Sequence, residues 1–331
     1  MELTTVWFGL IAVLWAGYFL LEGFDFGVGI LLPVLGRDDR ERRLLINTIG
    51  PVWDGNEVWL IVAGGATFAA FPEWYATLFS GFYLPLLLIL VALIIRGVAF
   101  EYRGKRGDLR WKRGWDAAIV AGSVVPAILW GVAFGNIVRG VRLDASHEYV
   151  GGFFELLNPY ALLGGLTTLG LFVLHGAVFL ALKTDGPMRE RAGSLAARLA
   201  VPVIVVAAGF LLWTVLAHPS LSGAILALAA AVALVAGALT IRVRREGWAF
   251  VATALTIVLA VAALFVTLFP DVMPSSISTA NSLTTANAAS TPYTLRVMTW
   301  VAVVFTPLVL AYQGWTYWVF RKRLTVERIP V

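Results

Sequence analysis

The chain has 331 residues, of which 60% are hydrophobic and 14% are charged, whereas an average soluble domain has roughly 45–50% and 25%. This composition indicates an integral membrane protein, and membrane topology explains the formal net charge of +5 better than nucleic-acid binding does. The chain has no cysteine, which excludes disulfides, thiolate zinc sites, iron–sulfur clusters and cysteine nucleophiles.

Nine segments are long and apolar enough to span a bilayer, which takes roughly 20 residues of helix. No basic region or small-residue cleavage pattern accompanies the first segment, so we expect it to remain as the first helix rather than a signal peptide. The expected spans are residues 6–35, 51–71, 75–100, 115–138, 159–182, 195–216, 222–241, 248–269 and 294–320. We therefore predict a polytopic all-α membrane protein with one membrane domain over residues 1–331.

The distribution of Lys and Arg supports nine spans. Connections on the cytoplasmic side of a membrane carry an excess of these residues. All but four of the 25 Lys and Arg follow the first, third, fifth, seventh or ninth span. The exceptions are Arg96, Arg139, Arg142 and Arg296. This alternation, which would be lost without the second and most polar span, predicts an outer N-terminus and a cytoplasmic C-terminus.

Four carboxylates lie within the first two predicted spans. Glu22 and Asp25 are part of EGFDFGVG, and Asp54 and Glu57 are part of WDGNEVW. The three-residue spacing in each pair places both side chains on one face of a helix. Ionisable residues at membrane depth are costly and mark proton or ion pathways. The predicted topology puts all four acids in the cytoplasmic half, so we interpret them as a proton path, with Arg96 as their counter-ion.

Each of these residues also has a structural interpretation. Asp54 could cap the second helix, and Glu22 and Glu57 could pair with Arg96 or face a partner subunit. Small residues around Asp25 allow another helix or a large ligand to approach closely. These residues are Gly23, Gly27 and Gly29.

His175 is the only histidine at membrane depth, and such a residue is more often a hydrogen-bonded part of the core than a ligand. Haem needs an axial His, Met, Cys or Tyr, and no second ligand is spaced to join His175. The chain has no phosphate-binding glycine loop and no HExxH pair, so we expect no metal site. Two classes remain from the residues alone: a subunit of a proton-consuming redox complex, and a proton-coupled transporter.

The chain resembles subunit II of the cytochrome bd-type quinol oxidases over essentially its whole length. The first resembling stretch is EGFDFGVGILLPVLGRDDRERRLLINTIGPVWDGNEVWLIVAGGATFAAFP, and IIRGVAFEYRGK, WGVAFGN, FPDVMPSS and RVMTWVAVV follow in order. The resemblance implies a heterodimer with subunit I in the prokaryotic plasma membrane that oxidises membrane quinol and reduces O2 to water. Lipids surround such a complex, and small accessory membrane subunits stay open as further partners.

In that family subunit I carries two b-type haems, the d-type haem and the quinol-oxidising loop, whereas subunit II supplies no haem ligand. By the resemblance, Asp25 and Asp54 match the aspartates of the proton path, and Glu22 falls where another acid is common. Glu57 departs from members that carry Gln there, so its part in the path stays open. Some members hold a structural quinone in subunit II, and the sequence does not decide whether this chain does. His175 matches no haem ligand.

Overall fold

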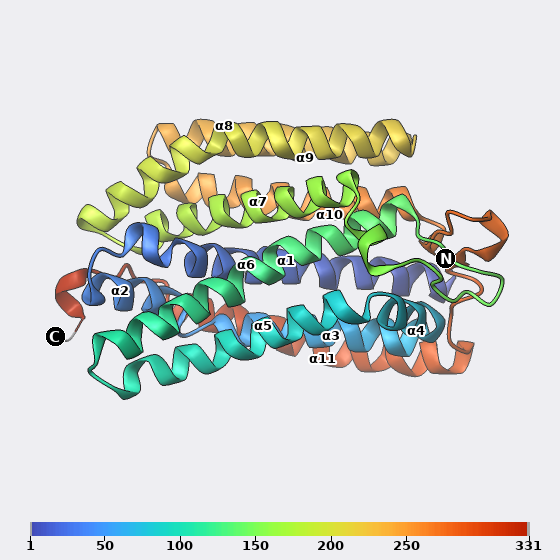
Figure 1. Cartoon of the computed structure of the whole chain (residues 1–331), viewed down its shortest axis with the longest axis horizontal. Coiled ribbons are helices and arrows are strands. Elements are labelled where there is room, and N and C mark those ends of the chain that lie inside the picture. Colours follow the sequence, from blue (N-terminus) through green and yellow to red (C-terminus); the bar gives the residue numbers. More distant parts are fainter. Residues whose placement is uncertain (1, 330–331) are drawn as a thin grey trace.

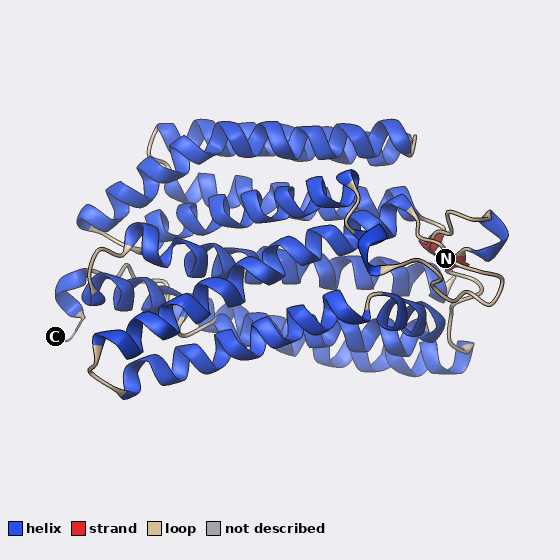
Figure 2. Ribbon diagram, in the orientation of Figure 1, coloured by secondary structure: helices blue, strands red, loops and turns tan. Residues whose placement is uncertain are grey.

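The structure is a computed structural model and describes residues 2–329, without the side chain of Arg328. Within these residues, eleven α-helices form an elongated bundle whose long helices run along one axis (Figure 1). Two short antiparallel strands, β1 (Asp271–Met273) and β2 (Leu283–Thr284), lie at one end of it (Figure 2). The prediction of an all-α protein is therefore confirmed.

The helices are α1 (Leu3–Leu35), α2 (Asp39–Ile49), α3 (Trp53–Ala70), α4 (Pro72–Gly81), α5 (Tyr83–Tyr102), α6 (Leu109–Arg139), α7 (Pro159–Lys183), α8 (Gly186–Ala217), α9 (Leu221–Arg242), α10 (Glu246–Leu268) and α11 (Pro292–Val319). Four short 3₁₀ helices lie between or after them: η1 (Arg103–Lys105), η2 (Phe153–Leu156), η3 (Thr279–Asn281) and η4 (Val326–Arg328). Among residues 2–329, eight helices are long and apolar enough to cross a membrane, and these exclude α2, α3 and α4.

The connections rich in Lys and Arg gather at one end of the bundle (Figure 1). We call this end the basic end, and it comprises residues 36–52, 103–108, 184–185, 243–245 and 320–329. The strands and the beginning of α1 lie at the opposite end.

The expected single helix over residues 75–100 is wrong, because the structure has two helices, α4 and α5, separated at Phe82. Pro85 gives the physical reason. Proline has no N–H to donate, and its ring clashes with the carbonyl four residues earlier, here that of Gly81. One helix therefore ends at Gly81, and the next accommodates Pro85 in its first turn.

Two charged segments that the sequence analysis left as connections are helical. The side chain of Asp38 caps α2 by accepting a 2.8 Å hydrogen bond from the Glu41 amide. α8 begins at Gly186, nine residues before the expected span. Its charged first turns are held by other elements: Arg189 pairs with Glu246 of α10, and Arg191 with Glu41 of α2.

α1 lies in the middle of the bundle and packs most closely against α7. A Cβ atom on Gly27 would lie 2.1 Å from the carbonyl oxygen of Phe172 and 2.8 Å from the Cα of Gly176. The backbones of α1 and α7 therefore touch at Gly27 and Gly176, neither of which has a side chain. α11 is the opposite case, because Leu295 is the one buried residue among those described in this helix.

Candidate functional site: a buried cluster of acids around Arg96

Arg96 of α5 forms the centre of a buried charged cluster. Its guanidinium pairs with Glu22 of α1 and with Glu57 of α3, the latter at 2.8 Å between Nη2 and Oε1. Arg96 and Glu22 are fully buried, whereas the Glu57 side chain is 24% exposed. The guanidinium also lies over the Phe26 ring, 4.7 Å from its centroid, in a cation–π contact. One cation thus joins three helices inside the bundle.

Asp25, also on α1, belongs to a second group of polar side chains beside the first. Asn56 of α3 donates a 2.7 Å hydrogen bond from Nδ2 to Oδ2 of Asp25. The Asn56 Oδ1 atom in turn accepts hydrogen bonds from the Tyr317 hydroxyl at 2.8 Å and from Gln313 Nε2 at 3.4 Å. Asn56 therefore links Asp25 to α11 and fixes the orientation of its carboxylate.

Some buried polar atoms of this cluster have no hydrogen-bond partner within residues 2–329. They are Glu22 Oε2, Asp25 Oδ1, Arg96 Nε and Arg96 Nη1. Buried polar groups in proteins are nearly always hydrogen-bonded, to internal water where the protein offers no partner. The two carboxylate oxygens can therefore accept further hydrogen bonds and the two guanidinium nitrogens can donate them, which is the property that a proton relay through water requires.

Asp54 lies outside this cluster. It is exposed in the first turn of α3, and its carboxylate accepts a 2.7 Å hydrogen bond from the Gly55 amide. The N-cap residue of α3 is Val52 and not Asp54, although the Asp54 carboxylate does bind one amide of the first turn. Of the four acids in the sequence interpretation, the structure brings Glu22, Asp25 and Glu57 together with Arg96 and leaves Asp54 at the surface.

Three residues of the cluster were not among the predicted site residues, namely Asn56, Gln313 and Tyr317. Gln313 and Tyr317 lie four residues apart near the end of α11, which places them on one helix face. Gln313 also accepts a 2.9 Å hydrogen bond from Trp59 Nε1. A carboxamide and a tyrosine at this spacing in an apolar span were the available signal.

His175 is fully buried in α7, where its Nδ1 atom lies 2.7 Å from the Thr253 hydroxyl of α10. Its ring stacks on Phe250 at 4.6 Å between centroids. Within residues 2–329, no group of three or more His, Asp or Glu side chains could hold a metal ion. His175 thus has the surroundings of a packed core residue.

An apolar cavity of about 250 Å³ lies between α6, α7, α8, α9 and α10. The hydroxyls of Thr167, Thr168 and Thr256 line this cavity, and each donates to a helix carbonyl. The carbonyls of a quinone ring would find no free donor among these three groups. The cavity therefore fits an apolar chain better than a quinone ring.

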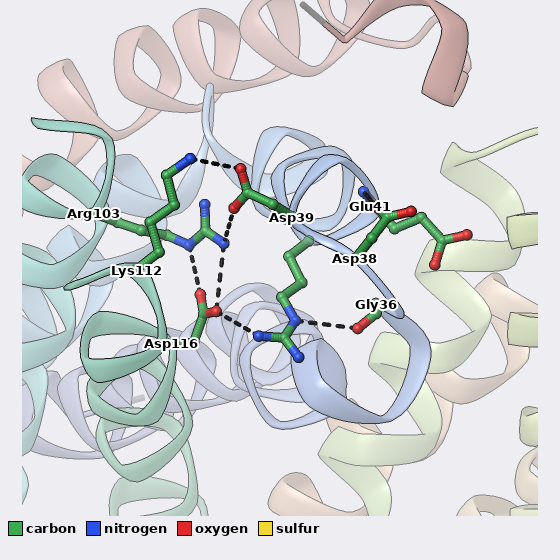
Figure 3. Close-up of polar contacts among 8 residues, drawn as sticks. Gly36, Asp38, Asp39, Glu41, Arg103, Lys112 and Asp116 are labelled. Atoms are coloured by element: carbon green, nitrogen blue, oxygen red, sulfur yellow. Dashed lines mark hydrogen bonds and ion pairs between the residues drawn. The ribbon is translucent and has the colours of Figure 1, made fainter. Parts of the chain in front are cut away.

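A separate charged network closes the basic end. Figure 3 shows Asp39 of α2 accepting hydrogen bonds from Arg103 at 2.8 Å and from Lys112 at 2.7 Å, while Asp116 accepts two from Arg103. Arg42 pairs with Asp116 at 2.9 Å. Partial burial opposes ionisation of Asp39, but the hydrogen bonds from Lys112 and Arg103 outweigh it and lower the pKa of Asp39. This network fastens α2 to η1 and α6.

The fold and the cluster define a multi-pass helical membrane protein with acids and an arginine buried near one end. The profile of the family described as cytochrome bd terminal oxidase subunit II matches residues 3–320. The chain belongs to this family, as the sequence resemblance predicted.

Known relatives match the chain over nearly its full length. It is 43% identical to the cytochrome bd ubiquinol oxidase subunit 2 of Bacillus subtilis (strain 168), over 98% of this chain and 97% of that protein. It is 39% identical to the cytochrome bd-I ubiquinol oxidase subunit 2 of Escherichia coli (strain K12), over 98% and 96%. A chain in the structure of bd oxidase from Geobacillus thermodenitrificans has the same fold, with a TM-score of 0.77 at 18% identity over 97% of this chain and 99% of that one.

Family membership decides between the two classes that the residues left open. The chain is a subunit of a terminal oxidase, which is an oxidoreductase complex, and it is a multi-pass membrane protein. The alternative of a proton-coupled transporter is set aside.

Proposed function

We propose that this chain is the haem-free subunit II of a complex that oxidises membrane quinol and reduces O2, and that its buried acids carry protons from the cytoplasm. The quinol substrate is proposed from the names of the relatives, which are ubiquinol oxidase subunits. The two b-type haems and the d-type haem are assigned to subunit I by the family resemblance. The complex would lie in the prokaryotic plasma membrane.

The proposed topology has nine crossings, with α3 as the second. α1 begins at one end of the bundle and α11 ends at the other (Figure 1), which requires an odd number of crossings, whereas eight helices qualify by length and composition. α3 supplies the missing one, because its 18 residues rise about 27 Å. An excess of Lys and Arg marks the cytoplasmic side, so the basic end is cytoplasmic and the N-terminus is outside.

The proposal of a proton path rests mainly on Glu57, because it is the acid of the cluster whose side chain is partly exposed. It lies one helix turn beyond the exposed Asp54 on α3 and pairs with Arg96, which also pairs with the fully buried Glu22. Side chains three residues apart share a helix face. A proton can therefore enter at Asp54, move to Glu57 and continue inward to Glu22 and Asp25. The sequence interpretation gave Glu57 the least secure part in the path, and its pairing with Arg96 supports a connecting part.

Arg96 and Asn56 have positioning roles in this proposal. Arg96 holds the carboxylates of Glu22 and Glu57 around one cation, and Asn56 orients Asp25. An arginine stays protonated in proteins and a carboxamide does not titrate, so neither residue relays a proton itself. Transfer between the acids would run through water at their free oxygen atoms.

The outer face of α3, α5 and α11 is the proposed contact with subunit I. This face is apolar and exposed, as at Ile61, Ile94 and Trp300, and it also carries Asp54 and part of Glu57. Carboxylates facing lipid are costly, whereas a partner subunit covers such groups. The entrance of the path at α3 would then lie beside the subunit that reduces oxygen.

Oxygen consumption by the whole complex tests the path. We expect Asp25→Asn and Glu57→Gln each to lower quinol-driven oxygen consumption by about one to three orders of magnitude, as for lost acid–base groups, with haem absorption retained. Asp54→Asn should lower it too, and Asp54→Glu should retain more activity than Asp54→Asn. Glu101→Gln is the matched control, since Glu101 is an exposed acid of α5 outside the cluster. Wild-type turnover in all the cluster variants would reject the path, and loss of the haems would make the acids structural.

A further inference from the structure

A polar cavity of about 430 Å³ lies at the basic end, remote from the acids around Arg96. It forms where α7 ends, α8 begins and α9 turns into α10. α8 contains Pro202 and bends, so its first turns slant across the end of the bundle (Figure 1). Small side chains such as Gly193, Ala196 and Ala197 line one part of the cavity. Its charged lining residues are Arg189, Arg242, Arg244, Asp185, Glu190 and Glu246.

The acids of this cavity are largely compensated, whereas two of its arginines are not. Glu246 pairs with Arg189 at 2.8 Å and with Arg323 at 3.9 Å. Asp185 pairs with the same two arginines, at 3.7 Å and 3.8 Å.

Within residues 2–329, neither Arg242 nor Arg244 takes part in an ion pair, and Glu190 does not either. The lining has three arginines and three acids, and Arg323 pairs with two of these acids from outside the lining. With Arg323 counted, the arginines outnumber the acids by one, and Arg242 and Arg244 are free to bind an anion.

The backbone holds Arg244 in a conformation that disfavours an arginine. Its φ angle is +57°, in the left-handed region that glycine usually occupies after the end of a helix. Its amide donates a 3.0 Å hydrogen bond to the Ile241 carbonyl, which closes the end of α9. Unfavourable conformations of this kind gather at functional sites. The general excess of arginine on the cytoplasmic side of membrane proteins would explain the positive charge of this region. It does not explain why an arginine, and not a glycine, has the left-handed conformation at position 244.

Two helix N-termini add positive potential at the same cavity. α8 starts at Gly186 and α10 at Glu246, and both residues line the cavity. Neither N-cap residue, Asp185 or Arg245, makes a side-chain hydrogen bond to its helix. Free amides at helix N-termini bind phosphate and other anions.

The surroundings of the cavity are those of a membrane interface. Trp248 and Val243, which flank the arginines, are both 65% exposed, and exposed tryptophan is typical of the head-group region. Exposed apolar side chains continue along α8 and α9, as at Val205 and Leu239. A ligand that fits has an anionic head and apolar chains. We propose that this cavity binds the phosphate head group of an anionic phospholipid, with its acyl chains along α8 and α9.

Binding of fluorescent phosphatidylglycerol to the delipidated oxidase complex tests this proposal. Arg242→Gln with Arg244→Gln should weaken binding by roughly 30-fold, which corresponds to about 1 kcal/mol for each arginine near an anionic surface. Binding of phosphatidylcholine should not change. Arg113→Gln is the matched control, because Arg113 is an exposed arginine of α6 on the same side of the membrane, outside the cavity. Equal binding by the double variant and the control would overturn the proposal.

The Arg244→Gly variant distinguishes a contact between the Arg244 side chain and the lipid from a purely conformational role of residue 244. Glycine fits the left-handed backbone, so this variant should leave the thermal stability of the complex unchanged or higher while still weakening phosphatidylglycerol binding by roughly fivefold. Unchanged binding would contradict the proposal.

Competition with inorganic phosphate tests whether the ligand is a soluble anion and not a lipid. Inorganic phosphate should not displace the lipid at millimolar concentration, and full displacement would overturn the lipid as the ligand. If the double variant fails to assemble, photoactivatable phosphatidylglycerol should label residues 242–249 of the wild-type complex, and labelling elsewhere would overturn the site.

Discussion

Arg96 and Glu57 form an ion pair with 2.8 Å between Nη2 and Oε1, which ties α5 to α3 directly beneath the outer face of the bundle. The same guanidinium holds Glu22 of α1. Three helices thus share one cation, so the cluster combines a structural role with the proposed proton path.

Arg96→Gln should destabilise the complex strongly. It leaves Glu22 buried without its cation, and removal of one partner of a buried ion pair costs about 3–5 kcal/mol. Glu57→Gln should cost less, because Glu57 is partly exposed and Gln keeps a hydrogen-bond acceptor. Thermal unfolding of the purified complex, followed through haem absorption, measures both. Equal stability of Arg96→Gln and the wild type would contradict the central place given to Arg96.

Gly27→Ala should disrupt the contact of α1 with α7. The new Cβ would lie 2.1 Å from a backbone carbonyl, which cannot move aside as a flexible side chain can. We expect a loss of at least about 2 kcal/mol of stability, in the range of overpacked cores, or failure to assemble. Gly9→Ala is the control on the same helix, because nothing lies within 4 Å of that position. It should be neutral or stabilising by up to about 1 kcal/mol, and equal effects of both changes would refute the packing argument.

The proposed orientation predicts the location of reporter fusions. Fusions at Lys105, Arg191 and Arg245 should report the cytoplasm, since Lys105 and Arg245 lie at the basic end and Arg191 lies in the first turns of α8 next to it. Fusions at Asp144 and Ser282 should report the outside. Opposite locations for Arg43 and Lys105 would mean that α3 does not cross the membrane.

The network around Asp39 predicts a dependence on pH. Hydrogen bonds from Lys112 and Arg103 lower the pKa of Asp39 below its ordinary value of 3.8 despite partial burial. Its contribution to stability is therefore fully present above pH 3.8 and is lost as the pH falls through the lower folded value.

Asp39→Asn should thus reduce the hydrogen-exchange protection of α2 at neutral pH, at the buried Leu44 and Leu45. The difference between the variant and the wild type should shrink below pH 3.8. A difference that grows as the pH falls below 3.8 would contradict the lowered pKa of Asp39.

The sequence predicted those parts of the fold that apolar periodicity and composition determine. The long apolar helices and the grouping of the basic connections can be predicted from each segment by itself. The four acids also stand out within their own segments as candidate functional residues. The break at Phe82 was also readable, because Pro85 conflicts with a continuous helix. The cap of α2 was readable too, from Asp38 followed by Glu41 three residues later.

The remaining features depend on contacts between distant segments. The charged first turns of α8 are stable because Glu246 and Glu41 pair with its arginines, and no local pattern reveals such partners. In the same way, Asn56 acquires its role from Asp25 and from Tyr317, which lies 261 residues further along the chain. The sequence could rank the four acids only by resemblance, whereas the fold separates the exposed Asp54 from the cluster.

Proton uptake during a single turnover tests the proton path most directly. The fully reduced complex in liposomes is mixed with O2, and a pH indicator follows proton uptake from the side of the basic end. In Asp25→Asn and Glu57→Gln complexes with normal haem spectra, we expect uptake to be slower by about one to three orders of magnitude, with Glu101→Gln unchanged. Uptake at the wild-type rate in both cluster variants would contradict a proton path through these acids.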